Sequence, residues 1–481
     1  MKSWNIRDSL YFIPFILFFF LSAPEYVHKS MYNDGIWYAT LSKNLANGIG
    51  TFWYPKLTET IFPIFHEHPP LVFGIQSLFF SVLGEHIFIE RFYAFTVFLL
   101  SAALIVSIWK LIFKSTPQLG KLWYIPLSLW LLNEVVYHYY PSNILEGTLG
   151  VFTLATTYLL LKVVNTALSR NDIIIIVLAG LSLFCATLSK GVVGLFPLAL
   201  FGLHWIVFRS FSFFQVLVRT FILTATLAIC YTALLSLEPA LDGLGKYFDS
   251  QFLASLNEER TTYHHRENRL HIIRRLLEIL IPTFLLTGGI FFLSKRKSKQ
   301  KLVSSKERKL LIFFVLIGLS ASFPIILSPK QAVYYLLPSL PYFAIGFSII
   351  VSPIVHKWIT LRGALNKHRV IAGVTLILLC ASIGFTITNI GKISKRDQQV
   401  LNDVCEIGKI VPPRSIIASR AYSAHLVGYF YRLSEISLDT SSYDRPYLIV
   451  EKKDSNIVDH AVYDNLGLNT LRYDLYQQKE Q

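Results

Sequence analysis

The sequence repeats long runs of apolar residues that are separated by short polar connections. A helix needs about 20 mostly apolar residues to cross the hydrocarbon core of a bilayer. About eleven stretches approach this length, and they lie at roughly 10–24, 89–112, 122–140, 143–164, 173–189, 191–208, 220–238, 276–294, 310–328, 333–352 and 370–389. Because 53% of the residues are hydrophobic and only 16% are charged, the chain is predicted to be a polytopic α-helical membrane protein.

The positive charges gather in alternate connections between these runs. With a cytoplasmic N-terminus, the inner connections contain the run KRKSKQK from Lys295 together with Lys110, Lys114, Lys121, Lys162, Arg170, Arg209, Arg219, Lys306, Arg308, Lys309, Lys357, Arg362, Lys367 and Arg369. Only Asp172 and Glu307 oppose them there. The positive-inside rule then predicts exoplasmic loops at about 25–88 and 239–275. Loop lysines and arginines account for the net charge of +15, so no nucleic-acid partner is predicted.

The chain changes character after Asn389, where a polar segment begins. Helical patterns near 397–409 and 422–432 alternate with the β-rich runs SIIAS, YLIVEK and LNTLRYDLY. We therefore expect a membrane domain over residues 1–395 and a small α/β domain over residues 396–481. An odd number of spans puts this domain on the exoplasmic side, where it would act as a rigid cap.

The first exoplasmic loop carries two helical patterns that lie between membrane spans. The first is NDGIWYATLSKNL, which Asn33 or Asp34 would cap and which Gly48 and Gly50 would end. Pro69 and Pro70 suit the first turn of the second. Both helices are expected to lie along the bilayer surface. The Asp34 carboxylate would then be a base or a ligand, or only a helix cap.

A dense group of possible metal ligands, His66, Glu67 and His68, precedes the second helix, and a further pair, His264 and His265, lies in the second loop. Nitrogen and carboxylate ligands from two loops suit zinc or a similar divalent ion. Alternate residues of an extended segment share a face, so either the two histidines of the triplet or Glu67 would bind the ion. The other reading is that all of them are ordinary polar loop residues.

Cations also gather on the exoplasmic side, where the positive-inside rule disfavours them. The second loop carries Arg260, Arg266, Arg269, Arg274 and Arg275, Lys190 lies in a tight SKG turn, and Lys330 lies before YYLLP. Such a cluster suits a phosphate, although Arg274 and Arg275 would also fit as side chains that snorkel from a span. Tyr334 and Tyr335 fit an interfacial aromatic belt. Glu146 is an acid inside an apolar helix, for which a functional role is the default hypothesis.

Together these segments resemble the GT-C glycosyltransferases, in particular the group of protein O-mannosyltransferases and the bacterial lipid A aminoarabinose transferase. The resemblance covers most of the membrane part. The residues that carry it are NDGIWYATLSKNL, HEHPPLVFGIQSLFFSVLGEHIFIER, LSKGVVGLFP, RTTYHHR and KQAVYYLLPSLP. An acid that opens one juxtamembrane helix, followed by E-x-P-P at the next, is its most specific feature.

The resemblance implies an inverting transfer of a sugar from a polyprenyl phosphate to an acceptor at the exoplasmic face. In this reading Asp34 deprotonates or orients the acceptor hydroxyl, and Glu146 is a second acid near it. The resemblance also implies that Glu67 holds a divalent cation (zinc, magnesium or manganese) with His264 or His265. It places Lys190, Arg266 and Tyr335 around the lipid phosphate, with Arg260, Lys330 and His68 as further candidates.

Two positions depart from the family pattern. Family members often have Asp-Glu where this chain has Asp34-Gly35, and a lysine where it has His68. The resemblance further implies a bacterial-type inner membrane and an acceptor that is lipid A, another envelope glycan or a protein. The alternatives are an O-antigen ligase- or polymerase-like enzyme, or a lipid or solute transporter without chemistry. A transporter would need more ionisable residues deep in its spans.

Overall fold

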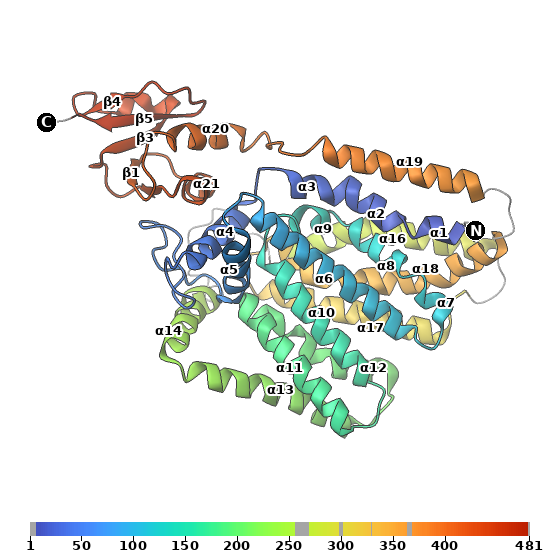
Figure 1. Ribbon diagram of the computed structural model, residues 1–481. Coiled ribbons are helices and arrows are strands. Elements are labelled where there is room, and N and C mark those ends of the chain that lie inside the picture. Colours follow the sequence, from blue (N-terminus) through green and yellow to red (C-terminus); the bar gives the residue numbers. More distant parts are fainter. Residues whose placement is uncertain (1–5, 255–268, 298–301, 329, 363–367, 480–481) are drawn as a thin grey trace. The chain divides into compact units, whose positions relative to one another are not determined.

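The structure is a computed structural model that describes residues 6–254, 269–297, 302–328, 330–362 and 368–479. It is mostly helical, with a small sheet near the C-terminus (Figure 1). By length and composition, eight helices within the described residues are able to cross a membrane: Asp8–Val27, Ile89–Ile112, Arg170–Phe208, Phe213–Leu235, His271–Arg296, Ser305–Leu327, Val333–Thr360 and Val370–Ile387. The prediction of a polytopic helical membrane protein is confirmed.

Most of the ranges predicted as spans correspond to helices in the structure. The prediction of one span at 122–140 is wrong, because the segment breaks into α8 (Tyr124–Leu131) and α9 (Glu134–Tyr139). The break lies at Asn133, whose side chain caps α9 by accepting a hydrogen bond from the Val135 N–H. The range 143–164 corresponds to α10 (Leu145–Val163).

The next two predicted spans form one segment without a connecting loop, and the chain turns back on itself near Gly191, because a Cβ on Gly194 would lie 2.9 Å from the Ala186 carbonyl carbon. The segment consists of α11 (Arg170–Lys190), the 3₁₀ segment η2 (Gly191–Ala199) and α12 (Leu200–Phe208). Gly191 has a φ of 74°, which favours glycine. A Cβ at this position would collide with the hydroxyl of Tyr247. The glycine therefore allows both the tight turn of the chain after Lys190 and the close approach of Tyr247.

Apart from the two helices of the first loop, the other described helices before residue 389 complete the membrane part. They are α1 (Ile6–Leu10), α2 (Ile13–Leu17), η1 (Phe18–Ser22), α3 (Ala23–Val27), α6 (Ile89–Ile112), α7 (Pro117–Gly120), α13 (Phe213–Leu235), α14 (Glu238–Tyr247), η3 (Phe248–Leu253), α16 (His271–Lys297), α17 (Ser305–Ser322), η4 (Phe323–Leu327), η5 (Val333–Ser339), α18 (Leu340–Arg362) and α19 (His368–Ile387).

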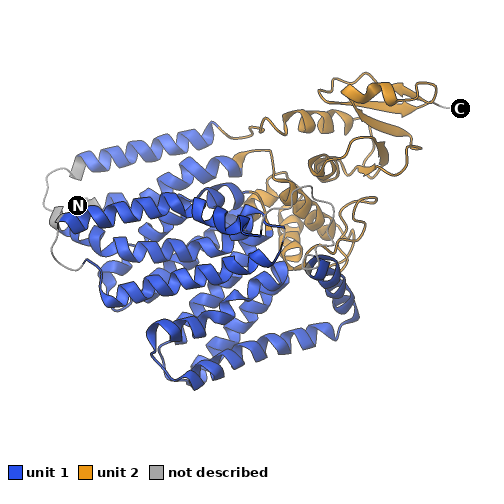
Figure 2. Cartoon of the chain, turned by 180° about the vertical axis from the view of Figure 1, so that it is seen from behind, with its two compact units in different colours: residues 1–26, 94–141, 145–388 blue, residues 27–93, 142–144, 389–481 orange. Residues whose placement is uncertain are grey.

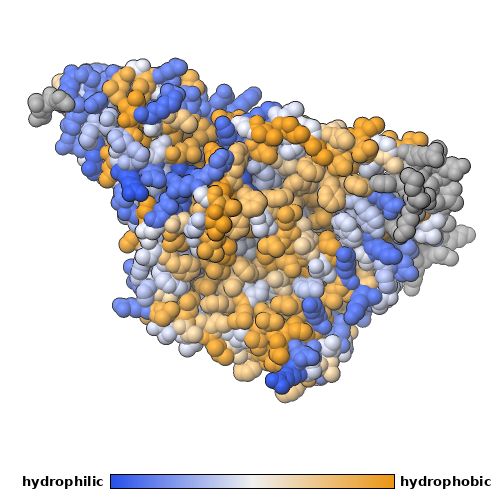
Figure 3. Space-filling view, viewed as in Figure 1, coloured by the Kyte–Doolittle hydropathy of each residue, from blue (hydrophilic) through white to orange (hydrophobic). Residues whose placement is uncertain are grey.

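The chain forms two compact units (Figure 2). Unit 1 comprises residues 1–26, 94–141 and 145–388, and it contains most of the apolar helices. Its interior buries large side chains such as Trp109, Trp130 and Tyr342, while Phe221 and Leu285 are exposed. Hydrophobic side chains cover much of the visible surface of these helices (Figure 3). An apolar exterior of this extent suits a surface that faces lipid.

Unit 2 comprises residues 27–93, 142–144 and 389–481. It contains α4 (Asn33–Ala46) and α5 (Leu71–Leu83) of the first loop, followed by α20 (Gln398–Ile407) and α21 (Ala424–Ser434). A five-stranded sheet has the order β2-β1-β3-β5-β4. Its strands are β1 (Ile416–Ser419), β2 (Ser437–Asp439), β3 (Tyr447–Glu451), β4 (Tyr463–Asn465) and β5 (Tyr473–Gln478), and the short helix η6 (Lys452–Ile457) follows β3.

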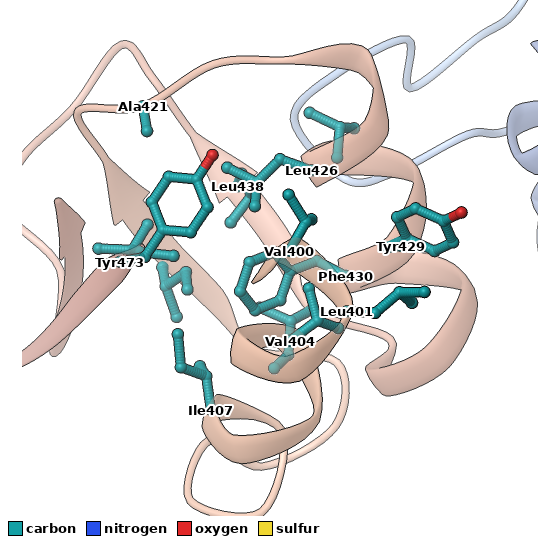
Figure 4. Close-up of a cluster of buried hydrophobic side chains, with 14 of the residues drawn as sticks. Val400, Leu401, Val404, Ile407, Ala421, Leu426, Tyr429, Phe430, Leu438 and Tyr473 are labelled. Carbon is teal, nitrogen blue, oxygen red and sulfur yellow. The ribbon is translucent and has the colours of Figure 1, made fainter. Parts of the chain in front are cut away.

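The sheet is mixed, because β1 pairs in parallel with β2 and β3, whereas β5 pairs antiparallel with β3 and β4. Helices α20 and α21 bury apolar residues in one core, which includes Val404, Leu426, Phe430 and Tyr473 (Figure 4). The predicted helices and the runs SIIAS and YLIVEK match this structure. The third run, LNTLRYDLY, is a strand only from Tyr473 onward.

The C-terminal segment packs directly against α4. The Trp37 indole Nε1 donates a hydrogen bond of 2.8 Å to the Ala424 carbonyl oxygen at the start of α21. A Cβ on Gly428 would lie 2.5 Å from the Ile36 side chain. Ile36 and Met31 also belong to the hydrophobic core of the C-terminal segment. Helix α4 and the sheet domain are therefore parts of one packed unit.

Candidate functional site

Asp34 lies in the first turn of α4 and does not cap the helix. The N-cap residue is Tyr32, with φ −66° and ψ 149°, and it makes no side-chain capping hydrogen bond. The prediction that Asn33 or Asp34 caps the helix is therefore wrong. Asp34 is half-buried. The partial positive charge of a helix N-terminus favours a carboxylate at such a position.

The segment that leads into Asp34 is held by residues far along the chain. The Tyr429 hydroxyl accepts a hydrogen bond of 2.7 Å from the Met31 N–H and lies 2.9 Å from Asp397 Oδ2. Arg396 donates to both the Met31 carbonyl and the Asp397 carboxylate. Burial raises the pKa of the Tyr429 phenol, with Asp397 adding to the effect. The neutral hydroxyl thus fixes the backbone immediately before α4.

His425 is a member of this environment that the sequence analysis did not identify. It lies on α21, 3.8 Å from Asp397, and its side chain is 14% exposed. Burial and the Arg396 charge lower the pKa of His425 below 6.5, while Asp397 and Asp34 oppose the shift. His425 therefore lies close enough to Asp34 for the two charges to interact. No spacing in the sequence links residues so far apart.

Gly35 stands where the glycosyltransferases that this chain resembles often have a glutamate, and its surroundings leave no room for a side chain. Its position is buried, and a Cβ there would collide with the carbonyl oxygen of Ser142. The Asn143 side chain donates a hydrogen bond of 3.0 Å to the Gly35 carbonyl oxygen and accepts one of 2.9 Å from the Gln76 side chain on α5. Residues 142–144 thus pack against the backbone of α4. Any side chain at position 35 would displace them.

The predicted metal triplet lies in the loop before α5. The helix begins at Leu71, with Pro70 as its N-cap, so the two prolines precede the first turn instead of lying in it. The His68 ring packs edge-on against Tyr38, at 5.7 Å between centroids, and the His66 ring packs against Tyr54 at 5.9 Å. Glu67 between them is half-buried.

Within the described part of the chain, no group of three or more histidine, cysteine or acidic side chains is arranged to hold a metal ion. His264 and His265, the other proposed ligands, lie outside the described residues. A structural or catalytic zinc site uses at least three protein ligands. The triplet does not supply this set, so a metal site there would depend on His264 or His265.

Three of the remaining predicted residues, Glu146, Lys190 and Tyr335, meet in unit 1. Lys190, at the end of α11, forms an ion pair with Glu146 in the first turn of α10. Glu146 is 1% exposed. The Lys190 ammonium nitrogen also lies 4.5 Å from the ring centroid of Tyr335 and 5.5 Å from that of Tyr334. Both tyrosines belong to η5, so three elements place their polar side chains together.

A small cavity of about 60 Å³ adjoins this group, and Glu146, Lys190 and Tyr335 line it together with apolar residues such as Phe196 and Ile325. Lys330 precedes η5 and does not line the cavity. The sequence analysis treated Tyr334 only as a belt aromatic and did not anticipate the Glu146–Lys190 pair. A buried carboxylate paired with a cation at the border of a cavity is a candidate for the binding of a polar group.

The five loop arginines fall into three groups. Arg260 and Arg266 lie outside the described residues. Arg274 and Arg275 both pair with Glu278 on α16, at 2.7 Å and 2.6 Å. The Arg269 carbonyl oxygen accepts a hydrogen bond from Gln331, which also accepts one from the Ile272 N–H. Gln331, which the sequence analysis did not single out, thus ties the end of the second loop to the segment before η5.

A scan against protein-family models and a search of curated proteins gave no match to this chain. Solved structures do match. The crystal structure of ArnT from Cupriavidus metallidurans bound to undecaprenyl phosphate superposes with a TM-score of 0.65 at 12% identity, covering 97% of this chain and 98% of that one. The apo form of ArnT gives a TM-score of 0.63, also at 12% identity, and covers 97% of both chains.

The oligosaccharyltransferase of Archaeoglobus fulgidus, crystallised with Zn and sulfate, matches with a TM-score of 0.51 at 14% identity. This match covers 89% of the present chain and 62% of the oligosaccharyltransferase. ArnT and this oligosaccharyltransferase are both members of the GT-C superfamily. The chain therefore has the GT-C fold, and ArnT is a solved structure that shares this fold over nearly its whole length.

Proposed function

We propose that this protein is an inverting glycosyltransferase that moves a sugar from a polyprenyl-phosphate carrier to an envelope acceptor at the exoplasmic face of a bacterial-type inner membrane. The main support is the Glu146–Lys190 pair beside Tyr335 at a cavity, in a chain that has the GT-C fold. The ArnT neighbour was crystallised with undecaprenyl phosphate. A polyprenyl-phosphate donor would place its prenyl chain along the membrane helices and its phosphate beside Lys190.

On the donor side, the reaction needs positive charge near the departing phosphate. Lys190 is the described cation best suited to this role, with Tyr335 packed against it. We assign Arg260, Arg266 and Lys330 to the same phosphate, and His68 to the place where relatives carry a lysine. When the bond between the anomeric carbon and the phosphate oxygen breaks, the electron pair leaves with the prenyl phosphate.

On the acceptor side, Asp34 would remove the proton from the attacking hydroxyl. Asp34 is half-buried in the first turn of α4, so the helix fixes the position of its carboxylate. The hydroxyl oxygen attacks the anomeric carbon from the face opposite the phosphate, and this inverts the configuration. Glu146 would orient the acceptor, with Lys190 balancing its charge.

We also propose a divalent cation, zinc, magnesium or manganese, which Glu67 would hold together with His264 or His265. Such an ion would supply positive charge for the donor phosphate. The oligosaccharyltransferase structure contains Zn. No step above depends on the ion.

A second candidate is transfer of a preassembled glycan, as an O-antigen ligase or polymerase performs it. The likeness to an oligosaccharyltransferase favours this reading. Membranes supplied with monosaccharide and oligosaccharide donors on the same polyprenyl carrier separate the two. A transporter without chemistry would give no covalent product with either donor.

The decisive experiment compares Asp34→Asn with the wild type in membranes, after equal expression has been verified. Transfer should fall by about a hundredfold or more if Asp34 is the base, a typical contribution of general base catalysis. Asp464→Asn changes an exposed acid on β4 of the same unit and serves as the control. Full activity of Asp34→Asn would remove Asp34 from the mechanism.

A further inference from the structure

Two adjoining cavities lie among α1–η1, α6 and the α7–α8 segment, all within unit 1. The first has a volume of about 520 Å³ and an almost wholly apolar lining that includes Phe15, Phe18, Leu99 and Val106. The second has a volume of about 330 Å³ and is bordered by Tyr11 and several lysines. Lys110 and Trp123 line both. The two cavities therefore form one groove with an apolar body and a basic end.

The basic end contains Lys110, Lys114 and Lys121, all exposed. None of the three forms an ion pair in the described part of the chain. Lys306 adds a fourth ammonium group nearby, because it donates a hydrogen bond of 3.3 Å to Ser115.

The acidic side chains near this end do not cancel its charge. Glu307 is occupied in capping α17, where its carboxylate accepts from the Ser304 N–H at 2.6 Å. Asp8 on α1 supplies one carboxylate. The end of the groove therefore keeps a net positive charge.

We propose that this groove binds an anionic phospholipid, with an acyl chain along α6 and the headgroup phosphate among Lys110, Lys114 and Lys121. Basic pockets between membrane helices bind anionic headgroups, and each lysine near such a surface contributes about 1 kcal/mol. Trp123 stacks on Tyr11, at 5.6 Å between centroids and 11° between planes, where the two parts meet. Such aromatic side chains suit the level of the headgroups.

The shape and charge distinguish this occupant from others. A free phosphate would leave the 520 Å³ apolar part unfilled, and a zwitterionic headgroup would bring a cation against three lysines. The lysines belong to the connections predicted to be cytoplasmic. The groove shares no lining residue with the Glu146–Lys190 cavity, so the proposal does not depend on the proposed enzymatic function.

Native mass spectrometry of the full-length protein in detergent tests the site, with phosphatidylglycerol and phosphatidylcholine of identical acyl chains as probes. The triple variant Lys110→Gln, Lys114→Gln, Lys121→Gln should weaken phosphatidylglycerol binding by about a hundredfold, because the loss of each lysine should weaken it roughly fivefold. The matched control is Lys162→Gln, Lys309→Gln, Lys357→Gln, which removes three exposed lysines outside the groove. The control should bind phosphatidylglycerol as the wild type does.

A second variant tests the apolar part. Ala103 is exposed and lines the groove, so Ala103→Trp should fill it and weaken binding of phosphatidylglycerol while thermal unfolding stays unchanged. Equal binding of both lipids by the wild type would overturn the proposal, as would undiminished phosphatidylglycerol binding by the triple variant. Displacement of the lipid by glycerol phosphate at equal concentration would overturn it as well, as would undiminished phosphatidylglycerol binding by Ala103→Trp.

Discussion

Lys190 and Glu146 form an ion pair across 44 positions of the chain, with the Glu146 carboxylate almost entirely buried. A buried pair of this kind gains Coulomb energy but loses hydration, so its net contribution to stability is small. Removing one partner is different, because the other charge is then left buried and uncompensated. This distinction allows the structural and the functional contributions of the pair to be separated.

The first prediction concerns this pair. Lys190→Met should destabilise the protein by about 3–5 kcal/mol, whereas the double variant Lys190→Met, Glu146→Leu should recover most of that loss. Transfer activity should be lost in both. Thermal unfolding in detergent and a transfer assay measure the two effects. Recovery of activity together with stability in the double variant would show that the pair has only a structural role.

The second prediction concerns Gly35, whose backbone is in contact with Ser142. Gly35→Ala should shift the start of α4 or displace residues 142–144, and it should lower both stability and activity. Gly288→Ala is the matched control, since a Cβ there meets no atom within 4 Å and alanine favours a helix by about 1 kcal/mol. A Gly35→Ala protein as stable as the control would contradict the packing described here.

The third prediction concerns Arg432, which anchors α21 to the end of the first loop. It pairs with Glu90 at 2.9 Å, both side chains being 2% exposed, and it donates to the carbonyl oxygens of Glu85 and His86. Arg432→Met should loosen unit 2 and increase its cleavage in limited proteolysis. Arg432→Lys should not rescue it, because an ammonium group cannot reproduce the forked geometry.

The exposed Arg414, which pairs with Glu435 at 3.4 Å, provides the control for this experiment. Arg414→Met should leave the proteolysis pattern unchanged, since exposed ion pairs contribute little. If Arg432→Met were cleaved no faster than Arg414→Met, the anchoring role of Arg432 would be refuted.

The fourth prediction concerns pH and His425. Because burial and Arg396 lower the pKa of His425 below 6.5 in the folded protein, the unfolded chain binds its proton more readily. Stability from this residue is therefore complete above pH 6.5 and is lost as the pH falls toward the lowered pKa. Asp397 and Asp34 oppose the shift and limit its size.

Thermal unfolding measured from pH 8 to pH 5 tests this effect. His425→Gln should reduce the loss of stability on acidification, while His460→Gln, which alters a histidine on an exposed turn, should not. An unchanged acid dependence in His425→Gln would show that other groups are responsible.

Much of the fold was predictable from local features. The apolar runs, the helix of Asn33–Ala46 and the helices of the C-terminal segment each depend on residues that are neighbours in sequence. Predictions of where helices break and which residues cap them were less accurate. Asn133 breaks the range 122–140 through a single side-chain cap, and Tyr32 takes the N-cap position by its backbone conformation alone.

The candidate residues Asp34, Glu146 and Lys190 were identified from sequence, because acids and cations at the ends of apolar runs are costly unless they are used. Tyr335 was a candidate only through the resemblance to the GT-C glycosyltransferases. The partners of these residues were not identifiable in this way. His425 beside Asp34, Ser142 against Gly35 and Tyr334 beside Lys190 are all contacts between distant segments. Such contacts depend on how the helices pack, and no local pattern encodes them.

The sequence by itself determined that the chain is a membrane protein with polar groups at the ends of its spans, since the transfer of apolar side chains into lipid depends only on the local run of residues. Only the tertiary structure decided that α4 joins the C-terminal sheet domain in one core and that Glu146 pairs with Lys190. The physical reason is that close packing and charge pairing are properties of atoms brought together by the whole chain.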